Sequence, residues 1–116
     1  MRFFAFTLAL LFTPALAVTP EAEEFIAITK KLEPVQCEKR KLRREIALAE
    51  IEKRDADAKA LKQRFAELNR NPEVAKLEKR LAELEPRLLD SRGRPRHPED
   101  LDAISLQHRK AFYRCE

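Results

Sequence analysis

The sequence has 116 residues, with 24 Lys and Arg against 20 Asp and Glu, so this is a small chain with a net charge of +4. It contains a single Gly and is dominated by Ala, Leu, Glu, Lys and Arg, which favours long helices over a sheet protein with many tight turns. Four of its seven Phe lie in the first 17 residues, which excludes a broad aromatic core in the remainder.

The first 17 residues have the features of a secretory signal peptide. Arg2 supplies the positive charge, an apolar run covers 3–12, and Ala15, Leu16 and Ala17 form a small-x-small cleavage site. Spanning a bilayer takes roughly 20 apolar residues, so this run is short for a membrane anchor, although a retained anchor stays open as the alternative. We expect an exported protein, periplasmic or secreted, with one helical domain over residues 18–116.

Two helices are predicted before residue 70. Thr19 and Pro20 provide an N-cap and a first helical residue for a helix over 20–33, and Pro34 is expected to end or bend it because it lacks a backbone donor. Neither Gly nor Pro occurs from 35 to 69, which predicts one long helix. Its apolar residues form two stripes, one of Leu42, Ile46 and Ala49 and the other of Leu48, Ile51, Ala58, Leu61, Phe65 and Leu68.

The segment 69–73 predicts a tight turn between antiparallel helices, since Asn71 can cap a helix that starts at Pro72. The helix predicted over 72–89 carries a leucine seam at coiled-coil spacing, formed by Val74, Leu77, Leu81, Leu84 and Leu88. A polar linker over 90–97 leads to a last helix over 98–115. We expect the seam to pack within the chain; a homodimer whose stalks form a four-helix bundle is the alternative.

Cys37 and Cys115 are expected to form a disulfide, because export places them in an oxidising compartment. The helix over 35–69 spans roughly 50 Å and the next two about 26 Å each, so two collinear helices match one long helix. A disulfide needs Cα atoms within about 7 Å, so helix 98–115 must continue in the direction of helix 72–89. Unpaired thiols or a bond between two chains are the alternatives.

These lengths predict an all-α fold. It is an elongated antiparallel hairpin of the long helix over 35–69 against collinear helices over 72–89 and 98–115. The short N-terminal helix over 20–33 packs at the base and covers the stripe around Ile46.

In that register, the disulfide gathers cations at one end of the rod. We name them the basic cap: Lys39, Arg40, Lys41, Arg43, Arg44, Arg109, Lys110 and Arg114. Such a group would attract acidic proteins, anionic lipids or other polyanions. The alternative is a helix face whose cations simply extend into solvent.

Motifs for catalysis or metal binding are missing. His97 and His108 are separated by Pro98 and lack a His-x-x-x-His or Cys-x-x-Cys pattern, so no metal site and no cofactor are predicted. Neither Ser91 nor Ser105 lies in a nucleophile elbow, and there is no glycine-rich phosphate loop. The sequence therefore predicts that the protein is not an enzyme.

We expect a non-catalytic adaptor or inhibitor-like module that binds an envelope or secreted protein through its helical surface or the basic cap. Direct binding of the basic cap to an anionic membrane surface or a polyanion is the alternative. Nucleic acid is an unfavoured partner, because only Phe112 and Tyr113 could stack near the cations.

Overall fold

The computed structural model describes residues 18–115, in which the chain forms α1 (Pro20–Ile51), α2 (Asp55–Arg70), α3 (Pro72–Leu88) and α4 (Pro98–Arg114). The predicted all-α class is confirmed. The predicted signal peptide over 1–17 lies outside the described residues. Among the helices of residues 18–115, none is long and apolar enough to cross a membrane.

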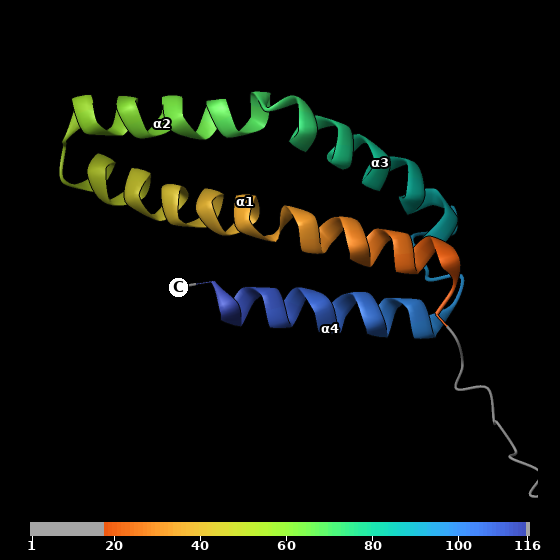
Figure 1. Ribbon diagram of the computed structural model, residues 1–116. Coiled ribbons are helices and arrows are strands. Elements are labelled where there is room, and N and C mark those ends of the chain that lie inside the picture. Colours follow the sequence, from red (N-terminus) through yellow and green to blue (C-terminus); the bar gives the residue numbers. More distant parts are fainter. Residues whose placement is uncertain (1–17, 116) are drawn as a thin grey trace, which may run out of the picture.

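Helix α1 is the central rod, with the other helices on either side of it (Figure 1). Helices α2 and α3 run back along one side, roughly in line with each other, and α4 lies along the first half of α1 on the other side. The predicted elongated hairpin, one long helix against two collinear helices, is therefore confirmed. It is built from different segments, however: α1 is the long leg, α2 with α3 is the return leg, and the short helix at the base is the C-terminal α4.

Helix α1 passes through Pro34, so the prediction that the first helix ends there was wrong. Leu32 and Val35, on either side of the proline, both pack into the cluster that holds Ile28 and Val74. Burial of these side chains offsets the hydrogen bond that the proline ring removes. The predicted N-cap is confirmed, because the Thr19 hydroxyl accepts from the backbone N–H of Ala22 at 3.3 Å.

The predicted single helix over 35–69 was also wrong, because the chain reverses between α1 and α2. Lys53 adopts a φ of 56° there, and the Arg54 N–H donates to the carbonyl of Ala49 at 2.8 Å. Ala49 and Ala58, close to this turn on the two helices, are both buried. Small side chains at these positions let α1 and α2 approach closely. The first stripe therefore faces the α2 part of the second stripe, whereas Leu48 and Ile51 stay exposed on α1.

Asn71 caps α3 as predicted, with its side chain accepting from the N–H groups of Glu73 at 3.0 Å and Val74 at 3.4 Å. The chain bends there without reversing, so the tight turn between antiparallel helices predicted over 69–73 was wrong. The second reversal lies in the loop over 89–97, where Gly93 has a φ of 75° and the Asp90 carboxylate accepts two backbone N–H groups. Helix α4 consequently runs parallel to α1 and is not collinear with α3 (Figure 1).

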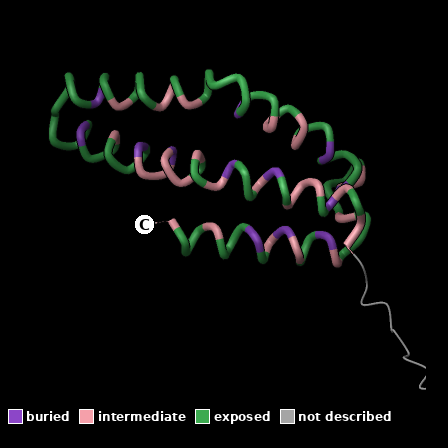
Figure 2. Tube along the Cα trace, viewed as in Figure 1, coloured by how far each residue is buried: buried purple, intermediate pink, exposed green. Residues whose placement is uncertain are grey.

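The apolar core follows α1 and is concentrated in its first half. One cluster joins α1 to α3 through Ile28, Leu32, Val74 and Leu84, and a second joins α1, α3 and α4 through Ala22, Leu88 and Ile104. The leucine seam of α3 thus packs within the chain. Figure 2 shows buried positions recurring along α1, whereas α2 is mostly exposed. The part of the hairpin next to the α1–α2 turn is therefore thinly packed.

Candidate functional site

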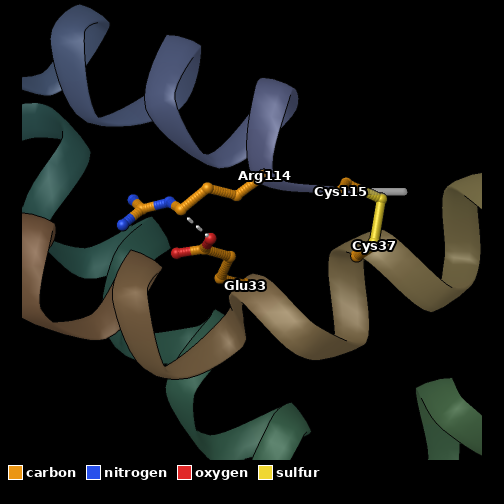
Figure 3. The surroundings of a disulfide bond; sticks show 4 residues. All are labelled: Glu33, Cys37, Arg114 and Cys115. Carbon is orange, nitrogen blue, oxygen red and sulfur yellow. Dashed lines mark ion pairs between the residues drawn. A yellow bond between two sulfur atoms is a disulfide. The ribbon is translucent and has the colours of Figure 1, made fainter.

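Helix α4 lies parallel to α1 and is joined to it near both of its own ends. Cys37 of α1 forms a disulfide with Cys115, with 5.4 Å between the Cα atoms, so the predicted pairing is confirmed. One helical turn earlier, the Arg114 Nε lies 3.1 Å from Glu33 Oε1, and Figure 3 shows the two side chains pointing toward each other beside the disulfide. At the opposite end of α4, Asp100 accepts hydrogen bonds from Thr19.

The reversed direction of α4, rejected from the sequence, is the one that forms the disulfide. Because the first helix does not stop at Pro34, Cys37 lies near the middle of a helix of 32 residues and not at the tip of the rod. Helix α4 has 17 residues, about the separation of Pro20 from Cys37, so a parallel α4 that starts beside Thr19 ends beside Cys37.

The predicted position of the basic cap at one end of the rod was wrong, because Cys37 lies near the middle of α1 and the members of the cap lie around it and face different ways. Lys39 is only 5% exposed, and its Nζ lies 3.2 Å from Glu78 Oε1 on α3. The Arg43 guanidinium lies 5.3 Å from the ring centre of Phe65 on α2. These two cations, like Arg114 with Glu33, contribute to packing between helices.

The other predicted cations remain closer to solvent. Arg40 and Lys41 are half-buried, whereas Arg44, Arg109 and Lys110 are exposed. The Arg40 guanidinium lies 4.7 Å from the ring centre of Phe112, so the disulfide does bring part of the 39–44 segment against α4. Arg40 therefore lies beside the helix that carries Arg109, Lys110 and Arg114.

The outer face of α4 combines cations with exposed apolar side chains. We call this surface the α4 patch, and the residues that line its shallow depression are Leu106, Arg109, Lys110, Tyr113 and Arg114. Tyr113 is 81% exposed and Leu106 47% exposed, and the Tyr113 ring meets that of Phe112 edge to face at 5.4 Å. Leu106 and Tyr113 were not among the predicted site residues, although the sequence places both within one turn of Lys110 or Arg114.

No protein-family model, curated protein or solved structure matches this chain.

The α4 patch carries side chains of the kinds that bind other molecules without reacting with them. Its guanidinium and ammonium groups donate to carboxylates or phosphates, while Leu106 and Tyr113 provide apolar area. In the described part of the chain, no three His, Cys, Asp or Glu side chains gather closely enough to hold a metal ion. His97 and His108 are both exposed.

Proposed function

We propose that this protein is an exported, non-catalytic adaptor or inhibitor-like module that binds an acidic surface of another envelope or secreted protein through the α4 patch. The observation that carries the proposal is the exposure of Tyr113, at 81%, and Leu106, at 47%, beside Arg109 and Lys110. Exposed apolar side chains rimmed by charge are typical of interaction sites, and Tyr and Arg supply much of the binding energy in protein interfaces.

The disulfide supports the compartment that the proposal needs. A bond such as Cys37–Cys115 persists in oxidising spaces, and the pattern of residues 1–17 predicts delivery to such a space. A partner in the periplasm or in the secretory space fits both features.

The way α4 is held also supports a binding role. Its first turn is joined to Thr19 through Asp100, and its C-cap residue, Cys115, is bonded to α1. A helix fixed at both ends presents its outer side chains in one arrangement, which lowers the entropy lost on binding.

Photo-crosslinking tests whether the α4 patch contacts a partner protein. A photoreactive amino acid at position 113 is expected to form an adduct with a discrete envelope or secreted protein. The same amino acid at position 79, an exposed position on α3, is expected to form none. Equal adducts at both positions, or none at 113, would contradict binding through the α4 patch.

A matched pair of charge reversals tests the role of the cations. Arg109→Glu with Lys110→Glu is expected to abolish the adduct at position 113, because an acidic partner would be repelled. Lys76→Glu with Lys79→Glu changes the net charge equally on exposed positions of α3 and should leave the adduct intact. Reversal at Lys39 is unsuitable, since it would place a second carboxylate beside Glu78 in a buried site.

Binding to an anionic membrane surface is a second candidate function. It is favoured by the alternation of cations with Leu106, Phe112 and Tyr113 along α4, a pattern that suits the lipid–water interface. It predicts cosedimentation with vesicles that rises with the fraction of anionic lipid and falls with salt. Absent or salt-insensitive cosedimentation would exclude this candidate and leave the protein partner.

A further inference from the structure

The side of α1 that carries Cys37 is covered by α4 over only part of its length. Helix α4 ends at Arg114, and its C-cap residue is bonded to the middle of α1, so α4 does not reach the part of α1 that leads to the α1–α2 turn (Figure 1). Helices α2 and α3 lie on the other side of α1. A stretch of uncovered helix surface therefore continues the line of α4 beyond the disulfide.

The helical period identifies the side chains on this surface. Steps of three, four and seven residues keep to one side of a helix, and such steps lead from Cys37 toward the turn. The residues reached in this way share the side of α1 that faces α4 further back. We call them the α1 strip: Arg40, Arg44, Ala47, Leu48 and Ile51.

The end of the α1 strip next to the turn is apolar and exposed. Leu48 is 48% exposed and Ile51 76% exposed, one helical turn apart. Packing against α2 does not use them, because Leu42 and Ala49 are the residues buried on the side of α1 that faces α2. Large aliphatic side chains that lie together in solvent, beside charged residues, are typical of an interaction site.

The end of the α1 strip next to α4 is cationic. Arg44 is exposed and Arg40 half-buried, and among residues 18–115 neither guanidinium lies within ion-pair distance of a carboxylate. The carboxylates of Glu38 and Glu50 point toward α2, where cations lie at 2.7 and 2.6 Å. Glu45 follows Arg44 in the sequence and therefore lies about 100° further around the helix. The strip thus offers positive charge without a matching acid of its own.

We propose that the α1 strip binds an amphipathic helix of a partner protein, which has carboxylates in its first turn and an apolar seam after them. The carboxylates pair with Arg40 and Arg44, and the seam packs on Leu48 and Ile51. From Arg40 to Ile51 the strip is roughly 17 Å long, which fits a helix of about 12 residues. The proposal does not depend on the proposed function, because the α1 strip and the α4 patch share no residue.

The order of charge and apolar residues along the strip sets the direction of the bound helix. Its N-terminus lies next to the C-terminal end of α4, and it runs toward the α1–α2 turn, parallel to α1. The macrodipoles of the two helices then align head to tail, and carboxylates are favourable in a first turn. A second copy of this chain is a poorer occupant, because two strips would bring four arginines into one interface and supply no carboxylate.

Fluorescence anisotropy with a labelled peptide tests the α1 strip. The probe is a designed helix of about 12 residues, with glutamates in its first turn and leucines at three- and four-residue steps. One peptide per oxidised chain is expected to bind. Arg44→Glu and Ile51→Lys should each lower the affinity about tenfold or more, and both positions are exposed, so circular dichroism should show that the variants fold. Lys76→Glu, at an exposed position of α3, is the control for net charge and should leave the affinity unchanged.

The arrangement of the peptide and the state of the free protein supply two further tests. The same peptide with its glutamates moved to the last turn is expected to bind several-fold more weakly. Absence of binding, unchanged affinity in the folded Arg44 and Ile51 variants, or an equal loss in Lys76→Glu would overturn the proposal. Sedimentation of the free protein should show a monomer. A dimer that Ile51→Lys dissociates would instead make a second copy the occupant of the strip.

Discussion

Asp100 binds Thr19 through both of its carboxylate oxygens, from the backbone N–H at 2.9 Å and from the hydroxyl at 2.5 Å. Thr19 is also the N-cap of α1, so one buried carboxylate joins the starts of two parallel helices. Asp100→Ala leaves these donors without an acceptor and is expected to lower the free energy of unfolding by about 2–3 kcal/mol. Asp102→Ala is the control, since Asp102 is exposed in the same part of α4; urea denaturation of both variants provides the comparison. Similar losses in the two variants would contradict the role of Asp100.

The disulfide is expected to supply much of the stability of the oxidised chain. The bond joins residues separated by 78 positions, and the chain-entropy model gives about 4.5 kcal/mol for a loop of this size. Cys37→Ser with Cys115→Ser should lower the free energy of unfolding by roughly this amount and expose α4 amides to hydrogen exchange. Reduction of the wild type should produce the same change. A loss below about 1 kcal/mol would mean that packing alone holds α4.

Lys53 carries a local backbone cost at the α1–α2 turn. Its φ of 56° lies in the left-handed region, which disfavours residues that have a Cβ atom. Lys53→Gly is expected to raise the free energy of unfolding by about 0.5–1 kcal/mol. Lys59→Gly makes the same substitution inside α2 and should lower it by about 1 kcal/mol. Thermal melts that move in the same direction for both variants would rule out strain at the turn.

Lys39 is a buried cation whose removal should cost less than the removal of its partner. Its Nζ lies 3.2 Å from Glu78 Oε1, and the side chains are 7% and 39% exposed. Lys39→Met keeps the apolar stem and removes the desolvated charge, so its stability should stay within about 1 kcal/mol of the wild type. Glu78→Leu leaves the ammonium group without its carboxylate and should destabilise the protein more. The opposite order in chemical denaturation would contradict a desolvation cost at the Lys39 ammonium group.

The ion pair between Glu24 and Arg80 predicts a dependence of stability on pH. Hydrogen bonds from the Arg80 guanidinium, at 2.6 and 3.0 Å, hold the pKa of Glu24 below its ordinary value of 4.5. A carboxyl with a lowered folded-state pKa adds stability above its unfolded-state pKa, and this contribution is lost as the pH falls through the folded-state pKa. Glu24→Gln should therefore melt below the wild type at neutral pH and converge with it in acid. A gap between the melting temperatures that persists in acid would contradict this assignment.

The sequence predicted best those features that depend on local chemistry. The caps at Thr19 and Asn71, each followed by a proline, form as expected because a cap involves only neighbouring residues. The all-α class and the pairing of Cys37 with Cys115 also follow from composition and from the presence of only two cysteines.

The reversal at Lys53 could not be predicted from turn residues, because the segment 52–54 contains neither Gly nor Pro. The change of phase between the stripe of Leu42, Ile46 and Ala49 and the part of the second stripe that runs from Ala58 to Leu68 was a usable signal. It was interpreted as two partners for one helix, when it marks two helices that face each other. Misplacing this turn and ending the first helix at Pro34 together misplaced Cys37, and with it the direction of α4.

The positions of the basic residues depended on tertiary contacts. A run of five cations over 39–44 is typical of a solvated helix face. The helical period nevertheless directs Lys39 and Arg43 toward Phe65. Burial of Lys39 against Glu78 becomes visible only when α3 is placed.

The disulfide joins α4 to the middle of α1, and this divides the rod into two halves that differ in how many side chains they bury. Beyond Cys37, toward the α1–α2 turn, only a few side chains such as Leu42, Ala49 and Ala58 are buried. Fraying should therefore begin at the exposed turn that contains Lys53 and Arg54, and stop near the sulfur bridge. A trypsin-like protease that nicks the chain there would produce two polypeptides that remain linked through Cys37 and Cys115. The cut would thus be seen as two bands on a reducing gel and as one band without reductant.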